Sequence, residues 1–289
     1  MEIIKKVREM QGICLQARRE GKSIGLVPTM GYLHEGHLSL ARAARAENDL
    51  VVMSIFVNPL QFGPREDFAT YPRDLERDCR LAESAGVDYV FAPAGEEMYP
   101  QGYNTYVEVL GEVTEKMCAR SRPGHFRGVT TVVLKLFNIV QPHRAYFGQK
   151  DAQQAVVIRK MVADLNLPLE IVTCPIVREA DGLAMSSRNT YLSPEERRQA
   201  LALPRALAAG RELITRGERD PRKVRERILE ALNRSPGVRV DYVEVCSGRD
   251  LSELGVLEGP VLLAAAVYVG KTRLIDNIDL EVEPCCAPC

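Results

Sequence analysis

The sequence predicts an α/β protein in which a doubly wound parallel sheet is followed by a smaller α+β domain. At roughly 150 residues per domain, the 289 residues are enough for about two domains. Up to about residue 175, short apolar runs alternate with longer amphipathic segments, whereas after Arg188 helical patterns come first and strand-like runs follow. We therefore expect a first domain at 1–175 and a second domain at 176–289.

Strands of the first domain are expected where apolar residues run without interruption. These runs lie at 23–28, 50–57, 88–93, 145–148 and 169–177. Between them, apolar residues recur at spacings of three and four, which predicts helices around 38–47, 72–85, 128–140 and 151–165. The start of the chain reads as a further amphipathic helix, with Ile3, Val7, Met10 and Cys14 on its apolar face. Strands that are apolar on both faces need helices on both sides, which is typical of a parallel sheet.

The second domain begins with a helix signal of its own. Ser193-Pro194-Glu195-Glu196 is a capping box with proline at the first helical position, so we expect a helix from there to about Arg216. A second helix is expected from about Pro221 to Asn233. Strand-like runs follow at 238–245, 260–269 and 272–280, and the last two are joined by a hairpin turn at Gly270-Lys271.

Composition excludes several classes of protein. Lys plus Arg is 38 and Asp plus Glu is 39, a net charge of −1, so a dedicated nucleic-acid binder is not expected and any polyanion site must be local. No apolar run reaches the roughly 18 residues of a membrane span. The N-terminus has no small-residue cleavage site, which favours a cytoplasmic location without membrane partners. Five cysteines are scattered singly (Cys14, Cys79, Cys118, Cys174 and Cys246) and are expected to be buried small hydrophobes.

The remaining cysteines, Cys285, Cys286 and Cys289, crowd the C-terminus and include a C-x-x-C pair. Such a pair supplies two ligands where structural zinc takes four, so a solvated tail is favoured over a zinc site. A metal-sensing module built on this tail is the alternative. Stoichiometric zinc that disappears when residues 285–289 are deleted would support it.

The strongest functional motif is VPTMGYLHEGHLSLARAAR (27–45), which runs from a strand end into a helix expected to begin near His34. Helix N-termini bind anions, and in α/β folds ligands lie at the carboxyl edge of the sheet. His34 and His37 stand three apart on the first turn, and Gly36 lets a ligand approach the backbone. A zinc protease would need H-E-x-x-H, which this segment does not match, and a surface pair without a role is the other alternative. Phosphate binding is favoured.

Two further segments are suited to phosphate. AYFGQKDAQQ (145–154) places Lys150, Asp151 and Gln154 at another strand end, although a solvated helix cap is the favoured explanation of this segment taken by itself. VREADGLAMSSRNTYLS (177–193) has a turn at Asp181-Gly182 followed by two serines and an arginine. These serines lack the G-x-S-x-G frame of a hydrolase, so the interpretations left for this segment are a phosphate clamp and a plain linker.

Two weaker segments carry polar groups. SIFVNPLQF (54–62) carries Asn58 and Gln61, uncharged amides that can orient a polar substrate. RPGHFRGV (122–129) adds Arg122, His125 and Arg127 to the local positive charge. Dinucleotide and P-loop signatures are absent from the sequence. No G-x-G-x-x-G follows a strand, and Gly270-Lys271-Thr272, which is read as a hairpin turn, is preceded by Ala265 where the first P-loop glycine belongs.

These motifs, in this order and spacing, resemble the pantothenate synthetase (pantoate–β-alanine ligase) family over nearly the whole chain. The resemblance implies a Rossmann-like domain of the HIGH-type nucleotidyltransferases, a C-terminal domain acting as a lid, and a cytoplasmic homodimer. It implies that the pantoate carboxylate attacks the α-phosphate of Mg²⁺-bound ATP. The pantoyl-adenylate so formed then reacts with β-alanine and releases AMP.

The resemblance also implies roles for matching positions. His37 matches the proton donor, His34 its HIGH partner, and Lys150 and Arg188, with the neighbouring serines, the groups that face phosphates. Gln61 and Gln154 match pantoate contacts, Gln61 also lying near β-alanine, with Asn58 and Arg122 as further active-site positions. No residue matches a metal ligand. The implied ATP contacts are Met30, Gly31, Tyr32, Leu33, His34, Glu35, Gly36, His37, Gly148, Gln149, Lys150, Asp151, Val177, Met185, Ser186, Ser187 and Arg188.

The chain departs from the family pattern at Gln149, where the family usually has an acidic residue. Because Lys150 and Asp151 remain, activity is expected to survive. The alternative function is another adenylate-forming or nucleotidyl-transferring enzyme of the same superfamily, and substrate dependence would distinguish the two. An RNA-binding role is disfavoured by the near-zero net charge.

Overall fold

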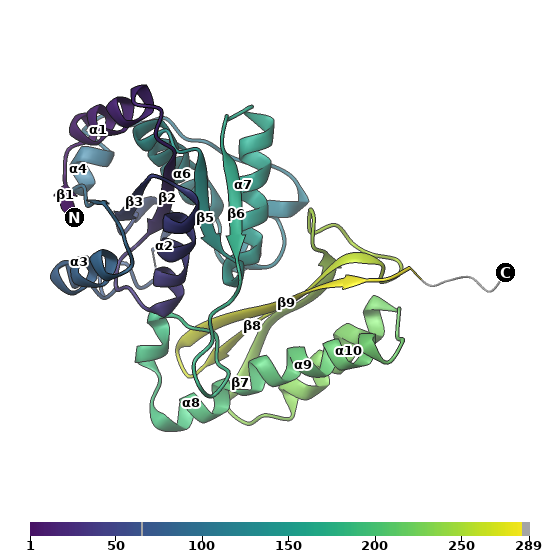
Figure 1. The fold of residues 1–289 in the computed structure, drawn as a ribbon. Coiled ribbons are helices and arrows are strands. Elements are labelled where there is room, and N and C mark those ends of the chain that lie inside the picture. The colour runs from purple at the N-terminus through teal and green to yellow at the C-terminus, as the bar shows by residue number, and fades with distance from the viewer. Residues whose placement is uncertain (65, 285–289) are drawn as a thin grey trace. The chain divides into compact units, whose positions relative to one another are not determined.

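The computed structural model describes residues 1–64 and 66–284. The chain divides into two compact units (Figure 1). The first unit consists of Met1–Leu110, Arg122–Gln149 and Val157–Val177. The second consists of Gly111–Ser121, Lys150–Val156 and the chain from Arg178 onward. The terminal cysteines Cys285, Cys286 and Cys289 lie outside the described residues.

A parallel sheet forms the centre of the first unit, as predicted. Its strands are β1 (Glu2–Ile4), β2 (Ile24–Thr29), β3 (Leu50–Ile55), β4 (Tyr89–Phe91), β5 (Arg144–Gly148) and β6 (Glu170–Cys174). They are ordered β1-β4-β3-β2-β5-β6, and every neighbouring pair is parallel. Apart from the edge strand β1, the chain order runs outward in one direction from β2 through β3 to β4, and in the other from β5 to β6. The switch point therefore lies between β2 and β5, where open α/β sheets bind ligands.

Two groups of helices pack on this sheet. α2 (Glu35–Glu47) contacts β2, β3 and β5 together with α3 (Leu75–Ser84), while α1 (Val7–Arg19) and α6 (His125–Val140) contact β2 and each other (Figure 1). Buried Val27, Val51 and Met53 belong to the core beneath α2 and α3. Because side chains alternate along a strand, buried Leu26 and Val52 face the other side of the sheet. Both faces are thus covered, as the apolar strands require.

Further elements complete the first part of the chain. These are α4 (Gly95–Met98), α5 (Cys118–Ser121), α7 (Ala152–Asp164) and the 3-10 turns η1 (Pro59–Gln61), η2 (Glu112–Thr114) and η3 (Gln149–Asp151). Residues of η3 and α7 fall on both sides of the division between the units.

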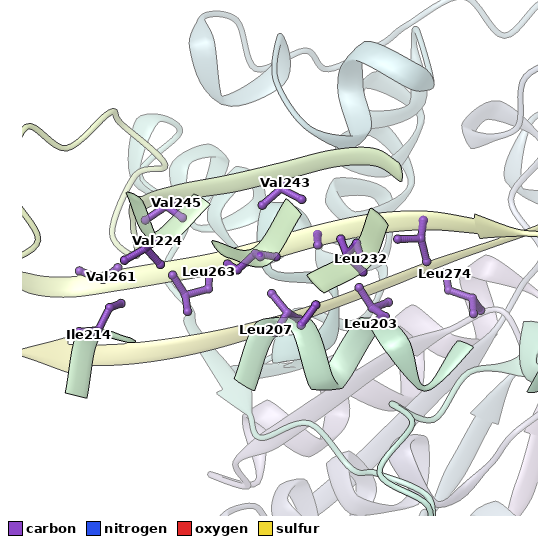
Figure 2. Packing of buried hydrophobic residues seen from close by; sticks show 14 of the residues in the cluster. Leu203, Leu207, Ile214, Val224, Leu232, Val243, Val245, Val261, Leu263 and Leu274 are labelled. Atoms are coloured by element: carbon purple, nitrogen blue, oxygen red, sulfur yellow. The ribbon is translucent and has the colours of Figure 1, made fainter. Parts of the chain in front are cut away.

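The second unit packs helices on an antiparallel sheet. Its strands are β7 (Val238–Ser247), β8 (Gly259–Val269) and β9 (Thr272–Val282), in that order, and Gly270-Lys271 forms the predicted hairpin turn. The helical elements are η4 (Ser187–Tyr191), α8 (Pro194–Ala200), α9 (Ala202–Thr215) and α10 (Pro221–Asn233). Figure 2 shows Leu203, Leu207 and Ile214 of α9 packed with Val224 and Leu232 of α10 and with residues of the strands. The sequence-predicted α+β arrangement is confirmed.

Two predicted helices were wrong in part. The N-terminal helix begins only at Val7, because Glu2–Ile4 forms β1 and pairs with β4 at the sheet edge. The helix expected from Pro194 to Arg216 is divided at Leu201 into α8 and α9. Pro204 has no N–H to donate to the carbonyl of Ala200, so a continuous helix would lose that hydrogen bond.

Two compositional predictions concern membrane spans and cysteines. In the part of the chain that the structure describes, no helix is long and apolar enough to cross a membrane. The five scattered cysteines are all buried and unpaired, as expected. Burial raises the pKa of Cys14 and of Cys246 to about 12, so these thiols are protonated at neutral pH.

Candidate active site

The loop that follows β2 has a backbone conformation that few residues adopt. Gly31 has φ +83° and Tyr32 has φ +51°, both in the left-handed region. The Thr29 hydroxyl donates to the carbonyl of Ser54 (2.7 Å) and accepts from the Gly31 N–H (3.1 Å), which joins the loop to β3. An added Cβ on Gly31 would lie 2.9 Å from an oxygen of Asp78, so a side chain does not fit there.

Asp78 of α3 holds this loop from outside. Its two carboxylate oxygens accept the N–H groups of Tyr32 and Leu33, each at 2.7 Å, and the side chain is almost fully buried. Burial raises the pKa of Asp78, while the two backbone donors oppose that shift. Because both oxygens accept N–H groups, the carboxylate fixes the strained loop immediately before the histidines.

His34 and His37 cap α2 reciprocally. The Nδ1 atom of His34 accepts the Gly36 N–H (3.2 Å), and the Nδ1 atom of His37 accepts the His34 N–H (3.3 Å). The ring centroids are 4.0 Å apart, which confirms that the rings share one face of the helix. Since each Nδ1 accepts a hydrogen bond, a neutral ring carries its own proton on Nε2. Both histidines are therefore set up as Nε2–H donors at the positive end of a helix.

Glu35 is the acidic residue in the first turn of α2. Its carboxylate forms an ion pair with Arg42, and this hydrogen bond lowers the pKa of Glu35. An unpaired carboxylate at this point would repel an anion. Pairing with Arg42 offsets that charge, although both side chains are largely exposed and the effect is screened by solvent.

Asn58 and Gln61 lie on the turn that follows β3. Asn58 caps η1, is almost fully buried, and donates to the Gln61 Oε1 (3.1 Å) and to the carbonyl of Gly128 (3.0 Å). The Gln61 Nε2 in turn donates to the thioether sulfur of Met30 (3.2 Å). Contacts in the first unit thus join Gln61 to Asn58 and to the loop after β2, as expected for neighbouring strand ends.

The Gln61 backbone is held by a separate chain of hydrogen bonds. Arg122 forms a bidentate ion pair with Glu66 (2.9 and 2.6 Å) and donates to the Nε2 of His125 (3.1 Å). An arginine cannot accept, so His125 carries its proton on Nδ1 and donates it to the Gln61 carbonyl (2.9 Å). The positive charge that Arg122 was expected to bring to the site is offset by Glu66.

Gly128 brings α6 close to η1. A Cβ added to Gly128 would lie 2.3 Å from the Leu60 carbonyl oxygen and 2.6 Å from the Gln61 Cα. Only glycine permits this approach of two backbones. The position of Gln61 therefore depends on the absence of a side chain at Gly128.

In the second unit, contacts around Lys150 fix its backbone. The Lys150 carbonyl accepts the Asn277 side-chain amide (3.0 Å), and the Lys150 ammonium lies 3.8 Å from a carboxylate oxygen of Asp151. Next to Asn277, the buried Asp276 pairs with Arg178 at 2.7 and 3.0 Å. Lys150 lies in η3, two residues after β5 ends at Gly148.

The serine-rich loop is stabilised by ion pairs of its own unit. Asp181-Gly182 forms the predicted turn, in which the Glu179 N–H donates to the Leu183 carbonyl (2.8 Å). Arg197 pairs with both Glu179 and Asp181. The Ser186 hydroxyl accepts the Arg188 N–H (3.3 Å) and caps η4, and Asn189 donates to the Glu179 carboxylate (2.6 Å). Met185, Ser186, Ser187 and Arg188 thus lie on a well-braced loop.

Several residues that shape the site were not found from the sequence. Asp78, Glu66 and Tyr99 act through contacts that join segments far apart in the chain, for example 41 residues between Tyr99 and Asn58. A single sequence carries no signal for such pairings. Only the capping role of Asn58, directly before Pro59, had a local signal.

Known proteins resemble this chain over nearly its whole length. The family model of pantoate-beta-alanine ligase matches residues 2–279. The pantothenate synthetase of Moorella thermoacetica is 64% identical over 98% of this chain and 99% of its own length. The crystal structure of pantothenate synthetase from Thermus thermophilus is 49% identical, with a TM-score of 0.92, over 98% of this chain and 100% of that one.

A further solved structure comes from Francisella tularensis. It is a pantoate-beta-alanine ligase described as complexed with beta-gamma ATP and beta-alanine. It is 35% identical, with a TM-score of 0.77, and covers 96% of this chain and 97% of that chain. A family model spanning nearly all residues and relatives of this identity leave one assignment: the chain belongs to the pantoate-beta-alanine ligase family.

Proposed function

We propose that the chain joins pantoate to β-alanine through a pantoyl-adenylate intermediate. Family membership makes it an ATP-dependent amide-forming ligase. In the first step a pantoate carboxylate oxygen attacks the α-phosphorus of ATP, and the bond to pyrophosphate breaks. In the second step the β-alanine amine attacks the acyl carbon, loses a proton, and AMP leaves. The products are pantothenate, AMP and pyrophosphate.

The observation that carries this proposal is the histidine pair at the start of α2. Attack at phosphorus builds negative charge on phosphoryl oxygens, and preorganised donors stabilise it most. His34 and His37 have their Nε2–H groups fixed as donors by the caps on Nδ1. They lie beside the β2–β5 switch point, at a helix end suited to phosphate. His37 is proposed as the proton donor.

The remaining residues of the ATP site are proposed from the family resemblance. Lys150, Ser186, Ser187 and Arg188 supply donors for phosphates, and the loop Met30–His37 contacts the nucleotide through its backbone. The bracing of Lys150 by Asn277 and of η4 by Ser186 supports their use as rigid donors. The other proposed ATP contacts are Gly148, Gln149, Asp151, Val177 and Met185.

Pantoate is proposed to bind through Gln61 and Gln154, with β-alanine also near Gln61. Asn58 acts on Gln61 by a hydrogen bond, and Arg122 acts on it through His125. Uncharged amides suit this task because they orient a carboxylate or hydroxyl without titrating.

Magnesium is proposed to enter as part of the nucleotide substrate. Among residues 1–64 and 66–284, no group of three or more His, Cys, Asp or Glu could hold a metal ion. Mg²⁺ commonly binds through substrate phosphates with one or two protein carboxylates, and Asp151, next to Lys150, is a carboxylate among the proposed ATP contacts. The ion, when bound, neutralises charge on the phosphates.

Location, assembly and domain limits are proposed as well. A cytoplasmic homodimer follows from the resemblance, and the buried, unpaired cysteines are those expected in a reducing compartment. The domains proposed are 1–175 and 176–289, the second serving as a lid. Sedimentation of the purified chain would test the dimer.

The test is a coupled assay of AMP formation with each substrate omitted in turn. We expect pyrophosphate release to require pantoate, and AMP release to require both pantoate and β-alanine. Metal removal by a chelator should stop turnover, and added Mg²⁺ should restore it. Turnover with a different acid and none with pantoate would overturn the proposal and favour another adenylate-forming enzyme.

A further inference from the structure

All the hydrogen-bonding groups of the buried Asn58 side chain are engaged. Its Nδ2 group donates to Gln61 Oε1 and to the Gly128 carbonyl, while its Oδ1 accepts the Leu60 N–H (3.3 Å) and the Tyr99 hydroxyl (2.8 Å). Rotating the amide by half a turn would set its oxygen against the Gly128 carbonyl and its NH₂ group against the Leu60 N–H. The amide therefore has one permitted orientation.

The orientation of Asn58 determines that of Gln61. Because Asn58 presents a donor, the Gln61 amide must turn its oxygen toward Asn58 and its Nε2 away from it. That Nε2 lies against the Met30 sulfur, a weak acceptor that a substrate oxygen could replace. A reversed Gln61 would present an oxygen to the carboxylate substrates and repel them.

Tyr99 is placed to stabilise this arrangement from the far end. Its ring packs at 5.0 Å from the Tyr103 ring and 6.1 Å from Phe56, and Lys135 lies over it. Burial raises the pKa of Tyr99, so the hydroxyl keeps its proton and remains a donor. Its hydrogen bond to the Asn58 Oδ1 is shorter than the one that the Leu60 N–H donates to the same oxygen (2.8 against 3.3 Å).

We propose that Tyr99 is a positioning residue for substrate, which acts through Asn58 to hold Gln61 with its NH₂ group facing the pantoate and β-alanine carboxylates. This proposal rests on the function proposed above. Tyr99 itself does not touch the reacting atoms. Its hydroxyl adds a second and shorter donor to the Asn58 oxygen, which strengthens the preference for the orientation that Gly128 and Leu60 also favour.

The experiment compares Tyr99→Phe with the matched control Tyr103→Phe. Both variants remove one hydroxyl from the same aromatic cluster, but in the described residues the Tyr103 hydroxyl makes no hydrogen bond. For Tyr99→Phe we expect KM for pantoate or β-alanine to rise about three- to tenfold, as for loss of one neutral hydrogen bond. The KM for ATP and kcat should stay within about twofold. Tyr103→Phe should resemble the wild type in all four parameters.

A second variant, Asn58→Asp, tests the amide orientation directly. The new carboxylate can only accept from Gln61, so Gln61 should reverse, and KM for pantoate should rise more than in Tyr99→Phe. The side-chain NH₂ resonances of Gln61 give a readout independent of turnover. In ¹⁵N-labelled protein we expect them to shift in Tyr99→Phe and Asn58→Asp but not in Tyr103→Phe.

The outcomes separate this proposal from the function on which it rests. If the wild type makes no AMP with pantoate and β-alanine, the proposed function fails and this role fails with it. If the wild type is active but Tyr99→Phe leaves every KM and the Gln61 resonances unchanged, Tyr99 has no positioning role. If Tyr99→Phe instead lowers kcat and raises every KM by similar factors, and also lowers the Tm, Tyr99 has a purely structural role and the proposal is overturned.

Discussion

Replacing Gly128 by alanine should displace the turn that carries Gln61. The new Cβ would lie 2.3 Å from the Leu60 carbonyl oxygen, about 1 Å closer than ordinary van der Waals contact allows. Because the atoms it meets belong to the backbone of η1, no side-chain rotation relieves the overlap. The turn, the helix α6, or both must move by about that distance.

The magnitude follows from two opposed effects. Alanine in place of glycine within a helix gains about 0.5–1 kcal/mol. Overpacking against fixed backbone costs about 1–3 kcal/mol, so we expect a net loss of about 1–2 kcal/mol in the free energy of unfolding. A displacement of about 1 Å in a substrate-positioning residue can lower the rate about 100-fold. Catalysis should therefore suffer more than stability.

The assay measures kcat/KM for pantoate together with the Tm of each variant. Gly12→Ala in α1 is the matched control, since an added Cβ there meets nothing within 4 Å. That variant should be as stable as the wild type or slightly more stable, and fully active. If Gly128→Ala keeps wild-type kcat/KM and Tm, the close approach of α6 and η1 does not position Gln61, and the reasoning is refuted.

Three further predictions concern the histidines and Asp78. His37→Ala should lower turnover about 10²- to 10⁴-fold and lower stability by about 1 kcal/mol through loss of a cap; rate measurements and thermal unfolding check this, and unchanged turnover would contradict it. Burial lowers the pKa of His143, whose Nδ1 accepts the Ile24 N–H at 2.9 Å. The neutral form is favoured in the folded state, so its contribution to stability is present above the ordinary pKa of about 6.5 and is lost as pH falls through the lowered value. The Tm of the wild type should therefore fall more between pH 7 and pH 5 than that of His143→Gln, and parallel curves would count against this. Asp78→Asn puts an NH₂ group against a backbone N–H and should cost about 1–3 kcal/mol while raising KM for ATP; a variant with wild-type Tm and KM would show that the loop needs no anchor.

Much of the fold could be predicted because many of its strands and helices follow hydrophobic periodicity or begin with a capping signal. The runs at 23–28 and 50–57 correspond to β2 and β3, and the capping box at Ser193 starts α8. Hydrophobic periodicity did not predict the break at Leu201, although Pro204 was a usable signal for it. Periodicity did not predict β1 either, because a strand of three residues is too short to show a repeat.

The contacts that shape the site were beyond the reach of local patterns. Asp78 lies on the polar part of a helical pattern, and nothing in its own segment indicates that it binds the backbone of Tyr32 and Leu33. Likewise, Arg122 was counted as a positive charge because Glu66, its partner, lies 56 residues away. Motifs identify which side chains carry the chemistry, whereas the tertiary fold decides which charges are cancelled.

The reciprocal cap of His34 and His37 makes the start of α2 depend on both rings acting as acceptors. A protonated imidazole donates from both nitrogens, so it can no longer accept a backbone N–H at Nδ1. Each protonation event would then remove a cap from α2 as well as add a charge at its positive end. The tautomer with its proton on Nε2 therefore serves the helix and the site together, and amide exchange at Gly36 should become faster in a variant that lacks the His34 ring.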